Sequence, residues 1–220
     1  MNGFMEYKNL IGVAITDKIS VYNCDCMELL RQTPDNYYSL ALVDPPYGIG
    51  AGKMTMGSGK HLFIKGKDWD SFIPDEKYFD ELFRVSHHQI IWGGNYFNLP
   101  KNNNWIIWDK LNPNLSFSEC ELAWCSIDKN TRIFKRLSTL PDLDGPKRHP
   151  TQKPIELYKY LLSKYTNQGD KILDTHLGSM SIAIACHDYG FELTGCELDE
   201  EYYKKGIERV KQHTDQLKIF

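Results

Sequence analysis

Residues 40–50 read LALVDPPYGIG and combine a short apolar run with an acid, two prolines and a tyrosine. The apolar run, residues 39–43, ends abruptly at Asp44. This pattern is typical of a buried strand that delivers a carboxylate to the edge of a sheet. The stretch therefore predicts a core strand with a ligand-holding turn at its carboxyl end.

Similar short strands recur along the chain and alternate with segments of helical period. Helices are expected at residues 27–32, 78–83, 155–166, 178–189 and 199–213. Strands are expected at residues 19–23, 39–43, 88–92, 105–109, 121–125, 131–136, 171–174 and 191–196. This alternation predicts an α/β fold with a mostly parallel, doubly wound sheet and helices on both faces.

Length and composition indicate an ordinary globular protein. The 220 residues suffice for one domain that buries roughly 70% of its unfolded surface. Apolar residues make up 41% of the chain and charged residues 25%, and no apolar run is long enough to span a bilayer. The N-terminal residues lack the apolar stretch of a signal peptide, so we expect a cytoplasmic protein. The six cysteines include no C-x-x-C pair, and no metal is expected.

Two basic stretches stand out against the net charge of −3. Residues 51–67 contain lysines and no acid, and residues 129–148 contain six basic side chains against two acids. Solvated surface loops would also explain both stretches. If the protein binds nucleic acid, the candidate contacts are Lys53, Lys60, Lys65, Lys67, Lys147 and Arg148.

A nucleoside site is predicted in the last third of the chain. Asp174 and Glu197 end or follow expected strands, and Gly178 between them opens a helix where the backbone can approach a ligand. The offset between the two acids suits a unit in which the later acid binds ribose hydroxyls. Met180 replaces the second glycine of the dinucleotide fingerprint, and no glycine-lysine pair completes a Walker A motif, so pyrophosphate is disfavoured. Ordinary capping roles remain the alternative for both acids.

The DPPY turn at residues 44–47 suits the exocyclic amine of a base. Consecutive prolines fix two φ angles and remove two backbone donors, which leaves the Asp44 carboxylate and the proline carbonyls as acceptors. Hydrogen bonds from both N–H groups of an amine to Asp44 and the Pro45 carbonyl would favour its nucleophilic form. Tyr47 offers a face for a planar ring. A plain strand-ending turn is the alternative.

The sequence resembles the amino-methyltransferases that modify adenine N6 or cytosine N4 in DNA with S-adenosylmethionine. DPPY at 44–47 is similar to their catalytic motif, HPTQKP at 149–154 to the segment near the methionine end of the cofactor, and LDTHLGS at 173–179 to their cofactor loop. GCELDEEYY at 195–203 and YNCDCMELL at 22–30 resemble the ribose-binding and adenine-binding segments. The motif order resembles that of the circularly permuted β group.

The resemblance implies a Rossmann-like methyltransferase fold and a set of site residues. One domain, residues 1–220, would contain a catalytic region at about 19–109, a short target-recognition region at about 110–148 and a cofactor region at about 149–212. Thr175, His176 and Met180 depart from the usual loop sequence, and a Met180 side chain could narrow the pocket. The catalytic residues would be Asp44, Pro45, Pro46 and Tyr47. The cofactor-binding residues would be Asp25, Cys26, Thr151, Lys153, Asp174, His176, Gly178, Ser179 and Glu197.

The resulting hypothesis is methylation of N6 of an adenine flipped out of duplex DNA. Asp44 rather than serine in the motif favours adenine, whereas methylation of cytosine N4 needs the same kind of amine site. RNA or a protein amide is a further alternative substrate. A catalytically silent DNA-binding partner is the rival of another class, motivated by Met180. The charge balance and the short recognition region suggest a homodimer. A role in restriction, in protection of a mobile element or in regulation is left open.

Overall fold

A computed structural model describes residues 5–49, 73–112, 118–127, 129–138, 140–141, 145 and 151–216 of the chain. Its described part is built around one sheet in the order β1-β2-β9-β8-β3-β4-β6-β5-β7. The strands β2, β9, β8, β3 and β4 run parallel, and β1 and β6 are antiparallel to their neighbours. The strands are β1 (Ile11–Ala14), β2 (Ile19–Asn23), β3 (Tyr38–Val43), β4 (Ser86–Trp92), β5 (Trp105–Asp109), β6 (Cys120–Cys125), β7 (Arg132–Lys135), β8 (Lys171–Asp174) and β9 (Glu192–Glu197).

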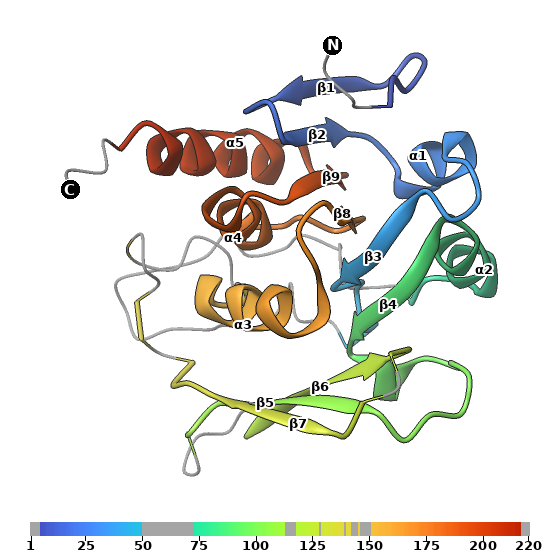
Figure 1. Cartoon of the computed structure of the whole chain (residues 1–220), viewed down its shortest axis with the longest axis vertical. Coiled ribbons are helices and arrows are strands. Elements are labelled where there is room, and N and C mark those ends of the chain that lie inside the picture. Colours follow the sequence, from blue (N-terminus) through green and yellow to red (C-terminus); the bar gives the residue numbers. More distant parts are fainter. Residues whose placement is uncertain are drawn as a thin grey trace.

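Helices cover both faces of the sheet. Figure 1 shows α3, α4 and α5 on one side of the strands and α1 and α2 on the other. Among the described residues, no helix combines the length and apolar character needed to cross a bilayer. The helices are α1 (Cys26–Gln32), α2 (Glu76–Val85), the short 3-10 helix η2 (Gly94–Tyr96), α3 (Ile155–Tyr165), α4 (Ser181–Tyr189) and α5 (Glu200–Thr214). The predicted α/β doubly wound fold is thus confirmed.

The core consists of one apolar layer on each face of the sheet. Alternation along β3 sends Leu40 and Leu42 into the layer under α3, α4 and α5, and Ala41 and Val43 into the layer under α1 and α2. Because both faces of this strand are buried, its sequence is a continuous apolar run rather than an alternation of apolar and polar residues.

One strand of the sheet differs from the sequence expectations. The strand β1 was not predicted, since all four of its residues are exposed and it is held by pairing with β2 rather than by burial. The strands β6 and β7 were both expected from the sequence; they lie in the region for which target recognition is predicted, and they belong to the central sheet. Pairing of β6 with β4 and β5 ties that region to the core.

Gly195 on β9 allows the turn after β8 to pack closely on the sheet. A Cβ at this position would lie 2.6 Å from Leu177 Cδ2 and 2.9 Å from the carbonyl oxygen of Asp174. Real Cβ atoms do not approach backbone this closely, so a side chain here would displace the residues that follow β8.

We predict that Gly195→Ala lowers the free energy of unfolding by about 1–3 kcal/mol, because the added methyl group overpacks a rigid backbone contact. Urea unfolding would measure the loss. The matched control is Gly206→Ala in α5, whose Cβ would meet the flexible side chain of Met180 at 2.7 Å. In Gly206→Ala the higher helix propensity of alanine stabilises α5 by about 1 kcal/mol, so the net decrease in the free energy of unfolding should be smaller than in Gly195→Ala. Wild-type stability of Gly195→Ala would contradict the packing argument.

Candidate functional site

The carboxyl ends of four parallel strands bring distant acids to one edge of the sheet. The register pairs Ala41 of β3 with Leu173 of β8, Asp174 with Gly195, and Asn23 with Glu197. The chain leaves β3 toward β4 on one side and leaves β8 toward β9 on the other, so a topological switch point lies between β3 and β8. Ligands of open α/β sheets bind at such a point.

Asp44, the first residue after β3, lies at this point and is held on both oxygens. Tyr47 OH donates a hydrogen bond to Asp44 Oδ1 at 2.6 Å, and Lys153 Nζ lies 2.5 Å from Asp44 Oδ2. Pro45 is buried and Pro46 is half-buried. Burial raises the pKa of Asp44, and the nearby Lys153 ammonium only partly offsets this effect.

Lys153 is also buried, with 3% of the residue exposed, and it bridges two carboxylates. Its Nζ lies 3.0 Å from Glu121 Oε2, while Lys110 Nζ lies 2.7 Å from Glu121 Oε1. Burial alone would raise the pKa of Glu121, but Lys153 and Lys110 lower it to about 2. Burial likewise opposes the charge of Lys153, and the carboxylates of Asp44 and Glu121 raise its pKa. Four charges therefore alternate in sign along this cluster.

An aromatic group supports the turn from the side of β4. The Tyr47 ring stacks on Tyr96 with centroids 5.1 Å apart and an angle of 11° between the planes, and Phe97 contacts Tyr47 edge-on. A Cβ at Gly93 would fall 2.2 Å from the Tyr47 ring, so only glycine allows the ring to lie there. Tyr96 itself is 45% exposed. Tyr47 thus orients Asp44 through its hydroxyl group, and its ring stacks on the exposed ring of Tyr96.

The glycine loop after β8 is fastened to the end of β9. The backbone N–H of Gly178 donates to Glu197 Oε2 at 2.8 Å, and that of Asp199 donates to Glu197 Oε1 at 2.9 Å. Gly178 has φ +49°, and a Cβ there would meet no described atom within 4 Å. The loop therefore offers open space beside a carboxylate that is already oriented by two amides.

Asp174 and His176 are neutralised by burial. The His176 backbone N–H donates to Asp174 Oδ1 at 2.9 Å, but burial still raises the pKa of this carboxyl group to about 8. Burial lowers the pKa of His176 to about 4. Thr175 Oγ1 connects His176 Nδ1, at 2.9 Å, with the hydroxyl group of Tyr78, at 2.7 Å. His176 thus joins a hydrogen-bonded chain that reaches α2.

Met180 does not enter the open side of the loop, contrary to the concern raised by the sequence. It adopts a left-handed conformation with φ 58° at the N-terminus of α4, and its side chain is fully buried. A Cβ on Gly206 of α5 would lie 2.7 Å from Met180 Sδ, so the Met180 side chain packs directly against the backbone of α5 at Gly206. The Met180 side chain fills the interior behind the loop, where the missing Cβ of Gly206 leaves room.

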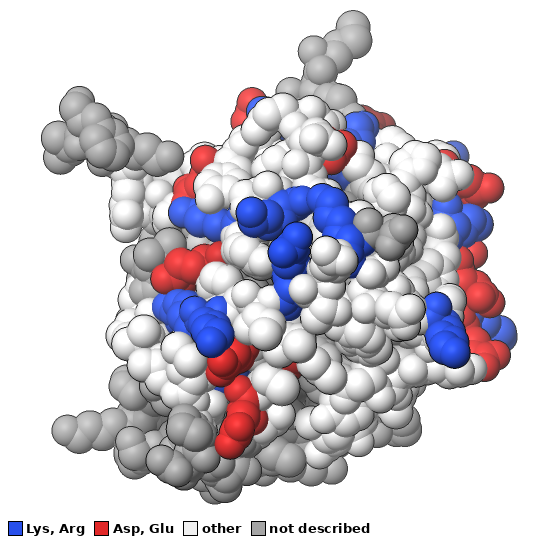
Figure 2. All heavy atoms as spheres, turned by 60° about the horizontal axis from the view of Figure 1, so that its bottom comes forward, with Lys and Arg blue, Asp and Glu red and all other residues white. Residues whose placement is uncertain are grey.

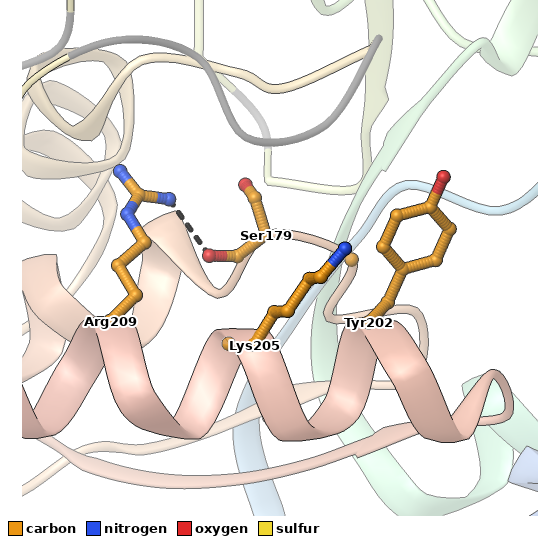
Figure 3. A pocket seen from close by; sticks show the side chains of 6 residues that line it. Ser179, Tyr202, Lys205 and Arg209 are labelled. Carbon is orange, nitrogen blue, oxygen red and sulfur yellow. Dashed lines mark hydrogen bonds between the residues drawn. The ribbon is translucent and has the colours of Figure 1, made fainter. Parts of the chain in front are cut away.

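α5 holds the same loop from outside. Arg209, 1% exposed, donates from Nη1 to the Ser179 carbonyl at 2.7 Å and to Ser181 Oγ at 3.0 Å. Figure 3 shows Tyr202, Lys205 and Arg209 extending from α5 toward Ser179 around a shallow pocket. Arg209 is a loop-fixing residue that the sequence did not reveal, because a basic residue on an amphipathic helix ordinarily faces solvent.

The other predicted cofactor residues border the site more loosely. Asp25 caps α1 and accepts the Met27 backbone N–H at 2.8 Å, and Cys26 follows it with a pKa that burial raises to about 12. Thr151 is half-buried in the turn before Lys153. Lys153 itself lies at Asp44, so the structure brings the described part of the HPTQKP segment, from Thr151 on, to the turn after β3.

The predicted nucleic-acid contacts, Lys53, Lys60, Lys65, Lys67, Lys147 and Arg148, lie outside the described residues. Within the described part, Lys129, Arg132 and Lys135 of the second basic stretch are exposed. Figure 2 shows Lys and Arg side chains gathered on the face seen when the β5–β7 end of the molecule comes forward.

Glu121 is the main site residue that the sequence analysis missed. It lies on the same face of β6 as Ala123 and Cys125, both almost fully buried, and is itself half-buried. An acid in phase with buried residues is a usable signal, since carboxylates removed from water require partners. Its partners Lys110 and Lys153 are distant in sequence, and no local pattern connects the three residues.

We predict that the stability of the apoprotein falls between about pH 7 and pH 8 and that Asp174→Asn removes this loss. The folded state keeps the Asp174 proton up to about pH 8, whereas the unfolded chain releases it near 3.9, so rising pH favours unfolding. His176 acts in the opposite direction only below its unfolded pKa of about 6.5. Urea unfolding should show a wild-type loss of roughly 1 kcal/mol relative to the variant across this window. Parallel curves would contradict the protonated state of Asp174.

A family model described as DNA methylase matches residues 118–208. Curated relatives align along most of the chain. Type II methyltransferase M2.DpnII of Streptococcus pneumoniae is 23% identical, with 90% of this chain and 92% of the relative covered. Type II methyltransferase M.HinfI of Haemophilus influenzae is 25% identical, with 86% of this chain and 67% of the relative covered.

Solved structures share the fold. The M1.HpyAVI–SAM complex superposes with a TM-score of 0.59 at 20% identity, covering 87% of this chain and 99% of that one. PvuII DNA methyltransferase, described as cytosine-N4-specific, has a TM-score of 0.59 at 12% identity and covers 92% and 88%. The match to a DNA methylase family model over residues 118–208, the relatives along most of the chain and the shared fold all make this chain similar to DNA methyltransferases, among them one solved as a SAM complex.

Proposed function

We propose that the protein transfers the methyl group of S-adenosylmethionine to N6 of an adenine flipped out of duplex DNA. The observation that carries this proposal is the position of Asp44, which ends β3 next to the glycine loop that follows β8. A carboxylate rigidly held beside a nucleoside-binding loop can accept hydrogen bonds from an exocyclic amine and hold it near the cofactor. Holding both reactants together supplies much of the catalysis in such a reaction.

The residues at the carboxyl edge fit S-adenosylmethionine. Gly178 leaves open space where a side chain would intrude, and Glu197 keeps an oriented carboxylate for ribose hydroxyls beside it. Asp25 and Cys26 would border the adenine, and Asp174, His176, Ser179 and Thr151 the rest of the molecule. When bound there, S-adenosylmethionine would supply the methyl group, made electrophilic by the positively charged sulfur that carries it.

Asp44 then serves as the acceptor of the proton that the methylated amine must lose. Burial raises its pKa and makes it a better base than an exposed aspartate. Tyr47 and Lys153 keep its two oxygens in place. In this mechanism Asp44 first accepts the N–H hydrogen bonds of the base and afterwards carries one proton away to solvent.

The flipped base would be held by the aromatic group around Tyr47. Extrusion of a base costs a few kcal/mol, which stacking on aromatic side chains offsets. The exposed Tyr96, stacked on Tyr47, adds to the aromatic surface available for this purpose. The two basic stretches would contact the DNA backbone, and the exposed Lys129, Arg132 and Lys135 belong to the second of them. The homodimer stays a prediction.

Adenine is preferred to cytosine because aspartate rather than serine begins the turn. The likeness to a structure described as cytosine-N4-specific keeps cytosine as the second candidate. The relatives described as Type II methyltransferases support a role alongside a restriction enzyme.

We predict that Asp44→Asn reduces methylation of unmodified plasmid DNA by at least about a hundredfold, because the amine loses its proton acceptor. Mass spectrometry of nucleosides would measure N6-methyladenine and N4-methylcytosine separately. Asp17→Asn, the same change at an exposed position, should behave like wild type. Abundant N4-methylcytosine would redirect the proposal to cytosine, and no modified base with wild-type protein would refute it.

We predict that Glu197→Gln weakens S-adenosylmethionine binding by about 10- to 100-fold, since it removes a charged hydrogen-bond acceptor worth about 1.5–3 kcal/mol. Isothermal titration calorimetry on the apoprotein would measure this. Glu192→Gln at the other end of β9 is the matched control and should bind normally. Undiminished affinity in Glu197→Gln would remove the ribose role from this residue.

A further inference from the structure

The charges around the catalytic turn form an alternating series in which Lys153 is buried and the other members are half-buried. Lys110, Glu121, Lys153 and Asp44 follow one another through contacts of 2.7, 3.0 and 2.5 Å, and the hydroxyl group of Tyr47 ends the series on Asp44. The two cations and two anions cancel. Because an unpaired buried charge costs several kcal/mol, each member depends on its neighbours for its ionised form.

We propose that Glu121 is a positioning residue that shares the Lys153 ammonium with Asp44 and thereby sets the strength of Asp44 as a hydrogen-bond and proton acceptor. The inference rests on the proposed methyl transfer to a base amine. It adds to that reaction a residue from β6, a strand that carries none of the predicted site residues.

The geometry shows why a second anion matters. With Tyr47 on Oδ1 and Lys153 on Oδ2, both oxygens of Asp44 already accept a hydrogen bond. An incoming amine must compete for these oxygens, and an ammonium bound to Asp44 alone would be a strong competitor. Glu121 lies 3.0 Å from the same ammonium and offers it another partner, so Lys153 can yield room on Asp44 without becoming an unpaired buried charge.

Lys110 limits how strongly Glu121 attracts Lys153. Its Nζ occupies Glu121 Oε1 at 2.7 Å, which leaves Oε2 for Lys153. With Lys110 present, Lys153 is shared between two carboxylates, and without it Glu121 would hold Lys153 more tightly. The two residues should therefore influence Asp44 in opposite directions.

Proton transfer follows from the same balance. The methylated amine carries one positive charge, its nitrogen–hydrogen bond breaks, and the proton binds a carboxylate oxygen of Asp44. Asp44 becomes neutral, and Lys153 retains Glu121 as its anion. The other titratable groups that act on Asp44 or respond to it are Tyr47 in the turn, Asp174 at the end of β8 and Tyr158 of α3. Each stays in place in the variants below.

The test compares Glu121→Gln with Lys110→Met in the apoprotein. Carbon-13 NMR of labelled aspartate carboxyl groups, with Asp44 assigned from the Asp44→Asn spectrum, would follow the Asp44 pKa directly. We expect this pKa to fall in Glu121→Gln, where Lys153 binds Asp44 alone, and to rise in Lys110→Met. Each shift should be about 0.5 to 2 pH units, as expected for charges a few ångströms away in a partly buried site. Glu119→Gln, an exposed acid next to β6, is the matched control and should shift nothing.

Turnover provides the second readout. In Glu121→Gln we expect kcat to fall about tenfold with unchanged S-adenosylmethionine affinity, and the acidic limb of its pH profile to move to lower pH. Glu121→Asp, which restores the charge, should recover the profile. In Lys110→Met the acidic limb should move to higher pH.

The outcomes separate this inference from the proposed function. Shifts of the same sign in both variants, or no shift in either, would overturn the role of Glu121, whether or not the protein methylates DNA. Absence of methylation by wild-type protein would instead refute the proposed function, and the titration would still decide the charge balance. If Glu121→Gln does not fold, Lys110→Met decides alone, because a rise in the Asp44 pKa supports the role and no rise overturns it.

Discussion

The pairing of β3 with β8 is the constraint on which the site depends. These strands come from opposite parts of the chain, yet the register Leu40 to Ile172 and Ala41 to Leu173 sets their carboxyl ends side by side. The turn after β3 provides an acceptor-only edge, and the turn after β8 provides a glycine loop. Neither turn could perform a two-substrate reaction alone. Because both follow fully buried strands, their relative position is fixed by the core rather than by the loops.

This arrangement removes two acids from water, and the loss of hydration perturbs their pKa values. Desolvation raises the pKa of Asp44 even beside Lys153, and it raises that of Asp174 to about 8. Strongly perturbed carboxyl groups in a cleft are typical of functional sites. Here the two acids have different surroundings, since Asp44 is ion-paired with the Lys153 ammonium and Asp174 accepts the backbone N–H of His176. Burial raises the pKa of both, and Asp174 stays protonated near neutral pH.

Local sequence patterns were sufficient to predict most of the fold and part of the site. The strands and helices around Asp44, Asp174 and Glu197 were predicted from apolar runs, turns and caps, because these depend on neighbours in the chain. The edge strand β1 was missed, since only pairing defines it. The packing of Met180 against Gly206 was also out of reach, because it joins two helices that no motif connects. Contacts between segments that are distant in the sequence could not be predicted from local patterns.

The strand β6, within residues 110–148, connects the edge of the sheet formed by β5 and β7 with the charged cluster at Asp44. The sequence predicts a recognition region there, and within it β6 pairs with β4 through Ile91 and Trp124 and places Glu121 at the ammonium that also contacts Asp44. In the sheet order β4-β6-β5-β7, the strand that carries Glu121 is paired with β5, and β5 is paired with the strand that carries the exposed Arg132 and Lys135. The residue that shares Lys153 with Asp44 and the exposed cations of β7 therefore belong to one set of hydrogen-bonded strands.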